Sequence, residues 1–227
     1  MVIEIDRLWE SALAWVNFHE ELNHTCRFLN YLPHAYLGGL YNLCLIPIAA
    51  RGSFVVADTF SGTSLLSFWS DVERFDVNAV WLVPSILRGL LTLHERTSGK
   101  HASSYKKIKF AFIGTAPIDK DTKESGESAF GFPILENFAL SETTFLTSEI
   151  NTKQSTDTRG VGAALPYVDV RIVPDGDANE PEIGEIFVRT PFLFSGYLQN
   201  DGAINLNLDQ QGYWPTGDIG KFAEDGH

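Results

Sequence analysis

The sequence predicts an α/β protein, with a mostly parallel sheet covered by helices and, after it, a smaller β-rich, barrel-like subdomain. Short apolar segments alternate with helical segments before Asn151, a pattern typical of parallel sheets covered on both faces. From Asn151 onwards, Ser, Thr, Gly and Pro become frequent and short alternating strands replace the helical period. We therefore expect an α/β subdomain over residues 1–154 and a β-rich subdomain, incomplete at its C-terminal end, over residues 155–227.

The composition narrows the classes of partner and compartment. A chain of 227 residues, 44% of them hydrophobic, is long enough for a sizeable core. Its net charge of −12 repels nucleic acids and anionic membranes. Cys26 and Cys44 lie in apolar stretches and indicate neither a disulfide framework nor a thiolate metal site. No signal peptide is apparent, and the longest apolar stretch, residues 37–50, is too short to cross a bilayer. We expect a cytoplasmic protein without a membrane span.

The α/β part begins with a predicted amphipathic helix over residues 5–22, in which Ile5, Leu8, Trp9, Ala12 and Val16 form the apolar side. Strands and helices then alternate. The predicted strands cover residues 27–33, 53–57, 77–83, 108–112 and 133–137, and the predicted helices cover residues 39–50, 64–74, 85–95 and 120–130.

The β-rich part shows period-two alternation around residues 168–172 and 186–188. In the α/β part, ligands are expected at the carboxyl ends of the parallel strands, where loops and backbone amides converge. The loops that follow Phe112 and Asn137 are therefore the predicted binding region.

Two segments resemble phosphate-binding loops but lack the necessary spacing. Residues 61–63 and 97–100 do not form the Gly-x-x-x-x-Gly-Lys-Ser/Thr pattern that directs backbone amides and a lysine at phosphates. The sequence also contains no Gly-x-Gly-x-x-Gly, no Gly-x-Ser-x-Gly and no His-Glu-x-x-His. Nicotinamide-binding, serine-hydrolase and zinc-protease interpretations therefore lose their main support.

Six short motifs follow one another along nearly the whole chain. They are Leu32-Pro-His-Ala-Tyr-Leu-Gly-Gly39, Gly114-Thr-Ala-Pro-Ile118, Phe138-Ala-Leu-Ser-Glu-Thr-Thr144, Gly184-Glu-Ile-Phe-Val-Arg189, Ser195-Gly-Tyr197 and Trp214-Pro-Thr-Gly-Asp218. In this order and spacing the chain resembles the adenylate-forming (AMP-dependent) family of acyl-CoA synthetases, aryl-CoA ligases, luciferases and nonribosomal-peptide adenylation domains. The resemblance places the chain in the central part of the family's large N-terminal domain.

The resemblance assigns roles around Glu142. It implies that Phe138 stacks on adenine, that Ser141 contacts the α-phosphate and that Glu142 holds magnesium; an aromatic face and a carboxylate suit these tasks. The family usually has Tyr-Gly-x-Thr-Glu here, so Phe, Ala and Ser are replacements, and Ala139 restricts backbone angles that glycine leaves open. The alternative is that Phe138 belongs to the core and that Glu142 begins a helix.

The other implied site residues lie in separate motifs. Gly114, Thr115 and Ala116 would form the turn that receives the adenine amino group, although an ordinary strand-ending turn would contain similar residues. Asp218 would accept hydrogen bonds from both ribose hydroxyls, a task suited to an ionised carboxylate. His34 would lie near the acyl pocket and the thiol entry, or else be a hydrogen-bonded structural histidine.

The implied activity is that of a ligase that makes an acyl-adenylate from ATP and a carboxylic acid and transfers the acyl group to CoA or to the pantetheine of an acyl carrier protein. The implied cofactors are ATP or AMP, Mg²⁺, and CoA or phosphopantetheine. We expect the chain to be a fragment and a poor enzyme by itself, because a Lys-containing phosphate loop and a Lys-bearing C-terminal domain of the family are not matched in it. The alternative is a non-catalytic nucleotide-binding or scaffold module.

Overall fold

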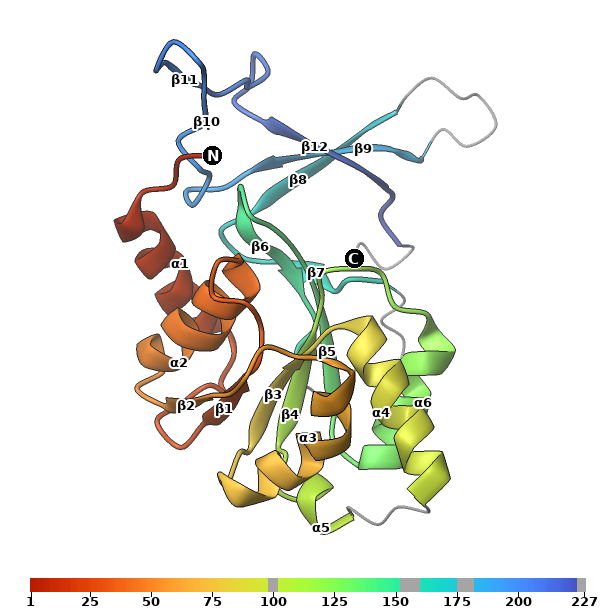
Figure 1. Cartoon of the computed structure of the whole chain (residues 1–227). Coiled ribbons are helices and arrows are strands. Elements are labelled where there is room, and N and C mark those ends of the chain that lie inside the picture. Colours follow the sequence, from red (N-terminus) through yellow and green to blue (C-terminus); the bar gives the residue numbers. More distant parts are fainter. Residues whose placement is uncertain (98–101, 152–159, 175–181, 224–227) are drawn as a thin grey trace. The chain divides into compact units, whose positions relative to one another are not determined.

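The computed structural model describes residues 1–97, 102–151, 160–174 and 182–223. Its helical elements are α1 (Ile5–Phe18), the π-helix η1 (Gly38–Leu45), α2 (Ile46–Ala49), α3 (Gly62–Arg74), α4 (Pro84–Thr97), α5 (Ala102–Tyr105) and α6 (Lys120–Phe130). Its strands are β1 (Arg27–Asn30), β2 (Ser53–Val56), β3 (Ala79–Leu82), β4 (Phe110–Ile113), β5 (Ile134–Leu140), β6 (Thr144–Ser148), β7 (Ala163–Ala164), β8 (Asp169–Pro174), β9 (Gly184–Arg189), β10 (Tyr197–Leu198), β11 (Ile204–Asn205) and β12 (Trp214–Gly220) (Figure 1).

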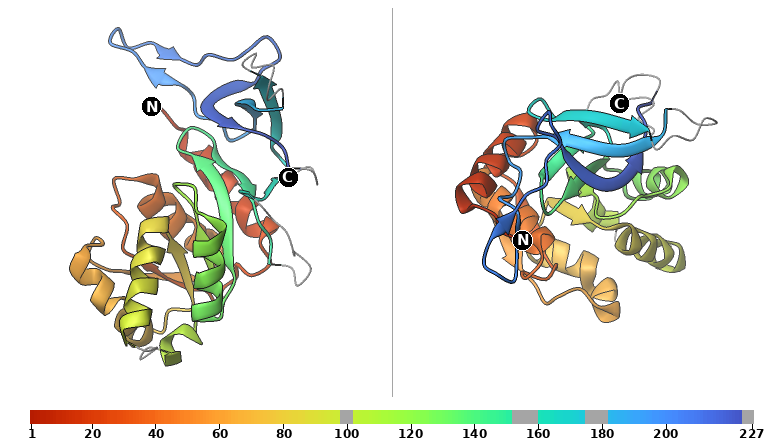
Figure 2. Two further views of the ribbon diagram at one scale, coloured as in Figure 1. Left: turned by 90° about the vertical axis from the view of Figure 1, so that its right-hand side faces the viewer. Right: turned by 90° about the horizontal axis from the view of Figure 1, so that it is seen from above.

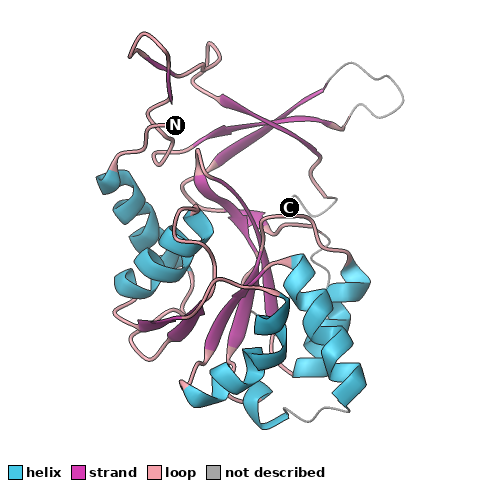
Figure 3. Ribbon diagram, in the orientation of Figure 1, coloured by secondary structure: helices cyan, strands magenta, loops and turns pink. Residues whose placement is uncertain are grey.

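The chain divides into two compact units. The first contains residues 1–11, 137–149 and 153–227, and the second contains residues 12–136 and 150–152. Within the described residues from 160 onwards the elements are all strands, whereas helices alternate with strands between residues 12 and 136 (Figure 3). The predicted fold class, a mostly parallel helix-covered sheet followed by a β-rich part, is thus confirmed. The subdomain boundary after residue 154 stays a prediction.

The α/β unit is built on parallel strands in the order β2-β1-β3-β4-β5. Helices cover both faces of this sheet (Figure 2). On one face Trp15 of α1 packs against Trp81 of β3 and Phe112 of β4, with ring centroids 6.0 and 5.3 Å away. On the other face Phe68 of α3 packs edge-on against Tyr31, which directly follows β1. These aromatic side chains are fully or almost fully buried, so the sheet carries the core of this unit.

The predicted apolar side of α1 was right for Leu8 and Ala12 and wrong for Ile5 and Trp9, which are exposed. Leu8 and Ala12 are buried as expected, but Ile5 is 66% exposed. The buried side instead continues through Ser11 and Trp15. The helix has apolar residues on more than one side, and the packing of the large Trp15 ring against the sheet determines which side faces the protein.

Local sequence explains where several helices begin and end. Ser61 caps α3 through a reciprocal pair of hydrogen bonds with Ser64, a capping box, which gives residues 61–63 a structural role in place of phosphate binding. Asp119 caps α6 by accepting the Thr122 backbone N–H, and Gly131 ends that helix in the left-handed conformation. Of the other segment that resembles a phosphate loop, residues 98–100 lie outside the described residues.

The β-rich unit has a small core of its own. β8, β9 and β12 form a three-stranded antiparallel sheet, β10 and β11 form a two-stranded one, and β6 pairs antiparallel with the end of β5. Five buried residues form the core cluster, against which other apolar side chains, including Phe138, pack; these five are Leu146, Val188, Leu193, Phe194 and Trp214. No helix in the described part of the chain is long and apolar enough to cross a bilayer.

Candidate nucleotide-binding site

Within the α/β unit, two predicted site segments follow the carboxyl ends of parallel strands. His34 comes four residues after the end of β1, and Gly114, Thr115 and Ala116 follow β4 directly. Because β1 and β4 run parallel in one sheet, both segments emerge from the same edge. The sequence therefore placed these residues at the edge where such sheets bind ligands.

The turn after β4 holds a residue in a rare backbone conformation. Thr115 has φ +74°, in the left-handed region that β-branched residues seldom adopt. Gly114 is buried, whereas Thr115 and Ala116 are exposed. Backbone strain of this kind clusters at binding sites, where the surrounding structure enforces it. The structure thus places Thr115 in a strained turn at this edge of the sheet, and the contact of the turn with adenine stays a prediction.

His34 is exposed, and its Nε2 lies 3.1 Å from the side-chain nitrogen of Asn30. Asn30 is fully buried, and the two N–H groups of its Nδ2 are shared among His34 Nε2, the Gly39 carbonyl at 2.9 Å and the Cys44 sulphur at 3.1 Å. If Asn30 donates to Nε2, the neutral ring of His34 carries its proton on Nδ1. The buried amide thus ties the histidine to the loop and to the π-helix that follows.

Within the β-rich unit, Ser141 and Glu142 lie in the turn between β5 and β6. The alternative that Glu142 begins a helix is therefore wrong: the chain turns back as an antiparallel hairpin, with Leu140 opposite Thr144. Ala139 lies within β5, and its φ is outside the left-handed region that favours glycine. The replacement of the family's glycine at this position therefore leaves the backbone unstrained.

The Glu142 carboxylate has a defined neighbour. Tyr197 donates its hydroxyl proton to Glu142 Oε1 over 2.7 Å. This hydrogen bond, with burial as a smaller cause, raises the pKa of Tyr197 to about 12. The phenol donates to Oε1 only, which leaves the second carboxylate oxygen of Glu142 to other ligands.

Asp218 projects from an irregularity in a strand. The pairing of β12 with β9 shifts register between Pro215 and Ile219, and Gly217 has φ +79°. Two hydrogen bonds hold this bulge: Thr216 Oγ1 donates to the Ile186 carbonyl at 2.7 Å and accepts the Asp218 N–H at 3.1 Å. Bulges redirect side chains and are common beside active sites. The Thr-Gly-Asp motif is thus a hydrogen-bonded bulge within a strand rather than a simple turn.

Phe138 lies in β5, and its partly buried side chain packs against the core cluster of the β-rich unit. This packing accounts for an aromatic residue here without reference to a ligand. Because the side chain is only partly buried, a face remains for stacking on a base. Its predicted adenine contact stays a prediction.

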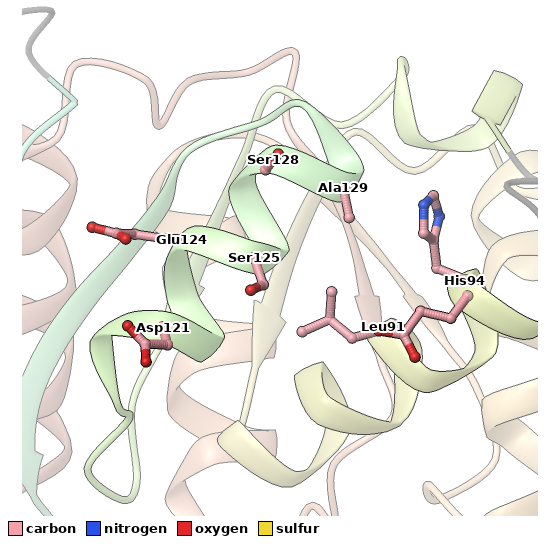
Figure 4. A pocket seen from close by; sticks show the side chains of 8 residues that line it. Leu91, His94, Asp121, Glu124, Ser125, Ser128 and Ala129 are labelled. Carbon is pink, nitrogen blue, oxygen red and sulfur yellow. The ribbon is translucent and has the colours of Figure 1, made fainter.

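An open groove of about 540 Å³ lies elsewhere, between α4 and α6 (Figure 4). None of the predicted site residues lines it. Its lining consists of Leu91, His94, Glu95, Asp121, Glu124, Ser125, Ser128 and Ala129. With three carboxylates and no lysine or arginine, this surface is unsuited to phosphate groups. The groove is therefore not the candidate nucleotide site.

Comparison with known proteins identifies the class to which this fold and these motifs belong. The model of the family described as "AMP-binding enzyme" matches residues 2–198. The chain therefore belongs to the AMP-binding enzyme family, and its predicted membership is confirmed.

Individual relatives are CoA ligases. The chain is 27% identical over 213 residues to malonate–CoA ligase of Arabidopsis thaliana, covering 88% of this chain and 34% of that protein. It is 30% identical over 205 residues to oxalate–CoA ligase of the same plant, covering 86% of this chain and 37% of that protein. The chain thus spans about a third of the length of these relatives.

Solved structures share the fold. ATP-bound MatB of Rhodopseudomonas palustris superposes with a TM-score of 0.81 at 24% identity, covering 99% of this chain and 43% of that one. O-succinylbenzoate CoA synthetase of Bacillus subtilis, in complex with ATP and magnesium, gives 0.78 at 22% identity, covering 99% and 45%. At these identities the likeness concerns the fold.

Proposed function

We propose that the chain is the nucleotide-binding part of an AMP-forming ligase that activates a carboxylic acid with ATP and passes the acyl group to CoA. The observation that chiefly supports this proposal is the family match over residues 2–198, which contains five of the six motifs in their family order. The CoA-ligase names of the relatives support the choice of reaction.

In this proposal Asp218 binds the ribose. A carboxylate offers two acceptor oxygens, which matches a pair of neighbouring hydroxyl donors. The bulge that presents Asp218 is held by Thr216 and by the Gly217 N–H, which donates to Glu185 Oε1 at 3.0 Å. Phe138 stacks on the adenine ring, and the main chain of Gly114 to Ala116 receives the adenine amino group.

Glu142 holds Mg²⁺ and Ser141 contacts the α-phosphate. No group of three His, Cys, Asp or Glu side chains in the described part of the chain could surround a metal ion. Mg²⁺ commonly uses only one or two carboxylates and takes its other ligands from phosphates and water, so a single carboxylate fits. When bound, the ion would offset the charge of the phosphates.

The proposed chemistry has two steps. A carboxylate oxygen of the acid forms a bond to the α-phosphorus of ATP as the bond to the pyrophosphate oxygen breaks. The thiol sulphur then bonds to the acyl carbon as AMP leaves, and the thiol proton passes to solvent. Positioning and charge neutralisation supply most of the catalysis in such reactions. His34 is proposed to lie near the acyl group and the incoming thiol.

Calorimetric titration with AMP tests the nucleotide part. We expect wild-type binding in the micromolar range and at least tenfold weaker binding for Asp218→Ala, because a charged hydrogen-bond acceptor for the ribose is lost. Asp201→Ala, in the turn between β10 and β11, is the control and should bind AMP like the wild type. Absence of binding at millimolar AMP would contradict the proposal.

Isotope exchange between ATP and pyrophosphate tests the reaction. We propose that this polypeptide alone exchanges slowly, because it contains no match to the phosphate-loop and C-terminal lysines that the resemblance implies. Exchange that depends on a carboxylic acid and is lost in Glu142→Ala would support a ligase. Tight AMP binding with no exchange under any acid would favour the alternative, a non-catalytic nucleotide-binding module.

A further inference from the structure

The Ser195-Gly196-Tyr197 motif has no task in the proposed reaction, yet its segment holds Glu142 at two points. The backbone N–H of Phe194 donates to the Glu142 carbonyl at 2.7 Å. The Tyr197 hydroxyl donates to Glu142 Oε1, also at 2.7 Å. Main chain and carboxylate of Glu142 are therefore held by one short segment that lies more than 50 residues away in the sequence.

Ring contacts and backbone hydrogen bonds hold the segment from Phe194 to Tyr197 in place. The ring of Phe194 is fully buried and lies edge-on to Tyr197 and Trp214, with centroids 4.8 and 5.5 Å apart. Ser195 N–H donates to the Val2 carbonyl at 2.9 Å, and Val2 N–H donates to the Gly196 carbonyl at 2.8 Å. The phenol thus projects from a backbone that is fixed on both sides.

Both the backbone conformation and the packing at position 196 require a glycine in the motif. Its φ of +135° is a conformation that L side chains rarely adopt, and a Cβ there would lie 2.4 Å from the Asn205 carbonyl oxygen. The close approach lets Tyr197 pair with Asn205 in the β10–β11 ribbon. The glycine therefore determines where the next residue, Tyr197, sits.

A carboxylate has two oxygens with about four lone-pair directions in total. Tyr197 uses one of these on Oε1. Hydrogen bonds from neighbouring groups commonly orient metal-binding side chains. Building on the proposed function, we propose that Tyr197 is a positioning residue: it holds the Glu142 carboxylate by Oε1 so that Oε2 faces the divalent cation of the bound nucleotide.

The chain offers a matched control. The Tyr213 hydroxyl donates to Asp169 Oδ2 at 2.6 Å, which is the same kind of tyrosine–carboxylate hydrogen bond in the same unit. Asp169 also pairs with Arg189 at 2.7 Å and has no role in the proposed site. Tyr213→Phe thus removes an equivalent bond without touching Glu142.

The test measures Mn²⁺ binding by the AMP-saturated protein, using the electron paramagnetic resonance signal of free Mn²⁺; AMP itself chelates Mn²⁺ only weakly, so the lost signal reports binding by the protein. We expect Tyr197→Phe to weaken Mn²⁺ binding about tenfold, while Tyr213→Phe binds like the wild type. AMP affinity without metal should be the same in Tyr197→Phe as in the wild type, which a purely structural role would not predict. Because Tyr197 is 43% exposed, we expect Tyr197→Phe to stay folded, which circular dichroism checks.

Glu142→Gln separates the two proposals. If this variant loses Mn²⁺ and Tyr197→Phe binds like the wild type, the positioning role is overturned and the metal role of Glu142 stands. If wild type and Glu142→Gln bind Mn²⁺ equally, or if neither binds it, the metal role fails and the positioning role fails with it. A loss of AMP affinity in Tyr197→Phe equal to its loss of Mn²⁺ affinity also overturns the inference.

Discussion

The imidazole of His19 lies 4.8 Å from the ring of Phe112, centroid to centroid, on the face of the parallel sheet that α1 covers. Trp15 and Phe18 complete an aromatic surround, with centroids 4.3 and 5.0 Å away. Burial in these surroundings lowers the pKa of His19 to about 3, because the charged ring would lose its hydration.

This burial predicts a pH-dependent stability. Below pH about 6.5 the unfolded chain binds a proton at His19 that the folded chain does not, so folding stability falls as pH decreases from 6.5 towards 3. The slope from this group is at most about 1.4 kcal/mol per pH unit. Urea titrations at pH 5 and pH 7 measure the change in the free energy of unfolding with pH. His19→Phe should reduce the difference between the free energies at these two pH values. An unchanged slope in that variant would show that His19 is not the group responsible.

The strained turn after β4 predicts a stabilising substitution. Thr115→Gly removes a side chain from a left-handed conformation that costs L-residues about 1–2 kcal/mol, against a smaller entropic gain of the unfolded chain. We expect a net rise of about 1 kcal/mol in the free energy of unfolding, measured with urea. Thr59→Gly, in an exposed loop at ordinary φ, should instead destabilise slightly. Loss of stability in Thr115→Gly would refute the strain.

The packing of the π-helix η1 against the loop after β1 requires a glycine at position 39. A Cβ on Gly39 would lie 2.3 Å from the Pro33 carbonyl oxygen and 2.7 Å from that of Leu32, and neither backbone atom can move freely. Gly39→Ala should therefore lower the free energy of unfolding by about 2 kcal/mol in a urea titration. Gly62→Ala is the control, since a Cβ there meets nothing within 4 Å. Equal stabilities of the two variants would be incompatible with this packing.

The capping role of Ser61 predicts a loss of stability without a loss of nucleotide binding. Ser61→Ala removes the side chain that accepts the Ser64 N–H at the start of α3 and should cost about 1 kcal/mol. Ser67→Ala, on an exposed position of the same helix, should cost less. Thermal melting measures both. A Ser61→Ala variant that binds ATP more weakly but melts normally would restore the phosphate-loop interpretation.

The sequence was sufficient to predict most of the α/β part. The helix over residues 120–130 was predicted with its observed bounds, and the strand that contains Phe110 and Phe112 was shifted by one or two residues. The periodicity of apolar residues indicates which side chains are buried. The capping residues Asp119 and Gly131 mark the two ends of the helix in the local sequence. The short helix α5 was missed because its four residues are too few to show a period.

The order of motifs along the sequence by itself determined the family, since each motif is a local pattern. Only the tertiary structure decided which side of α1 is buried, that Ser141 and Glu142 occupy a hairpin turn, and that Tyr197 meets Glu142. These features depend on contacts between distant segments. Trp15 packs against the sheet, so the side of α1 that carries it is buried, and β6 pairs with β5. The backbone around Gly196 places the Tyr197 hydroxyl within hydrogen-bond distance of the Glu142 carboxylate. No local period encodes such pairings, because their free energy comes from partners that folding brings together.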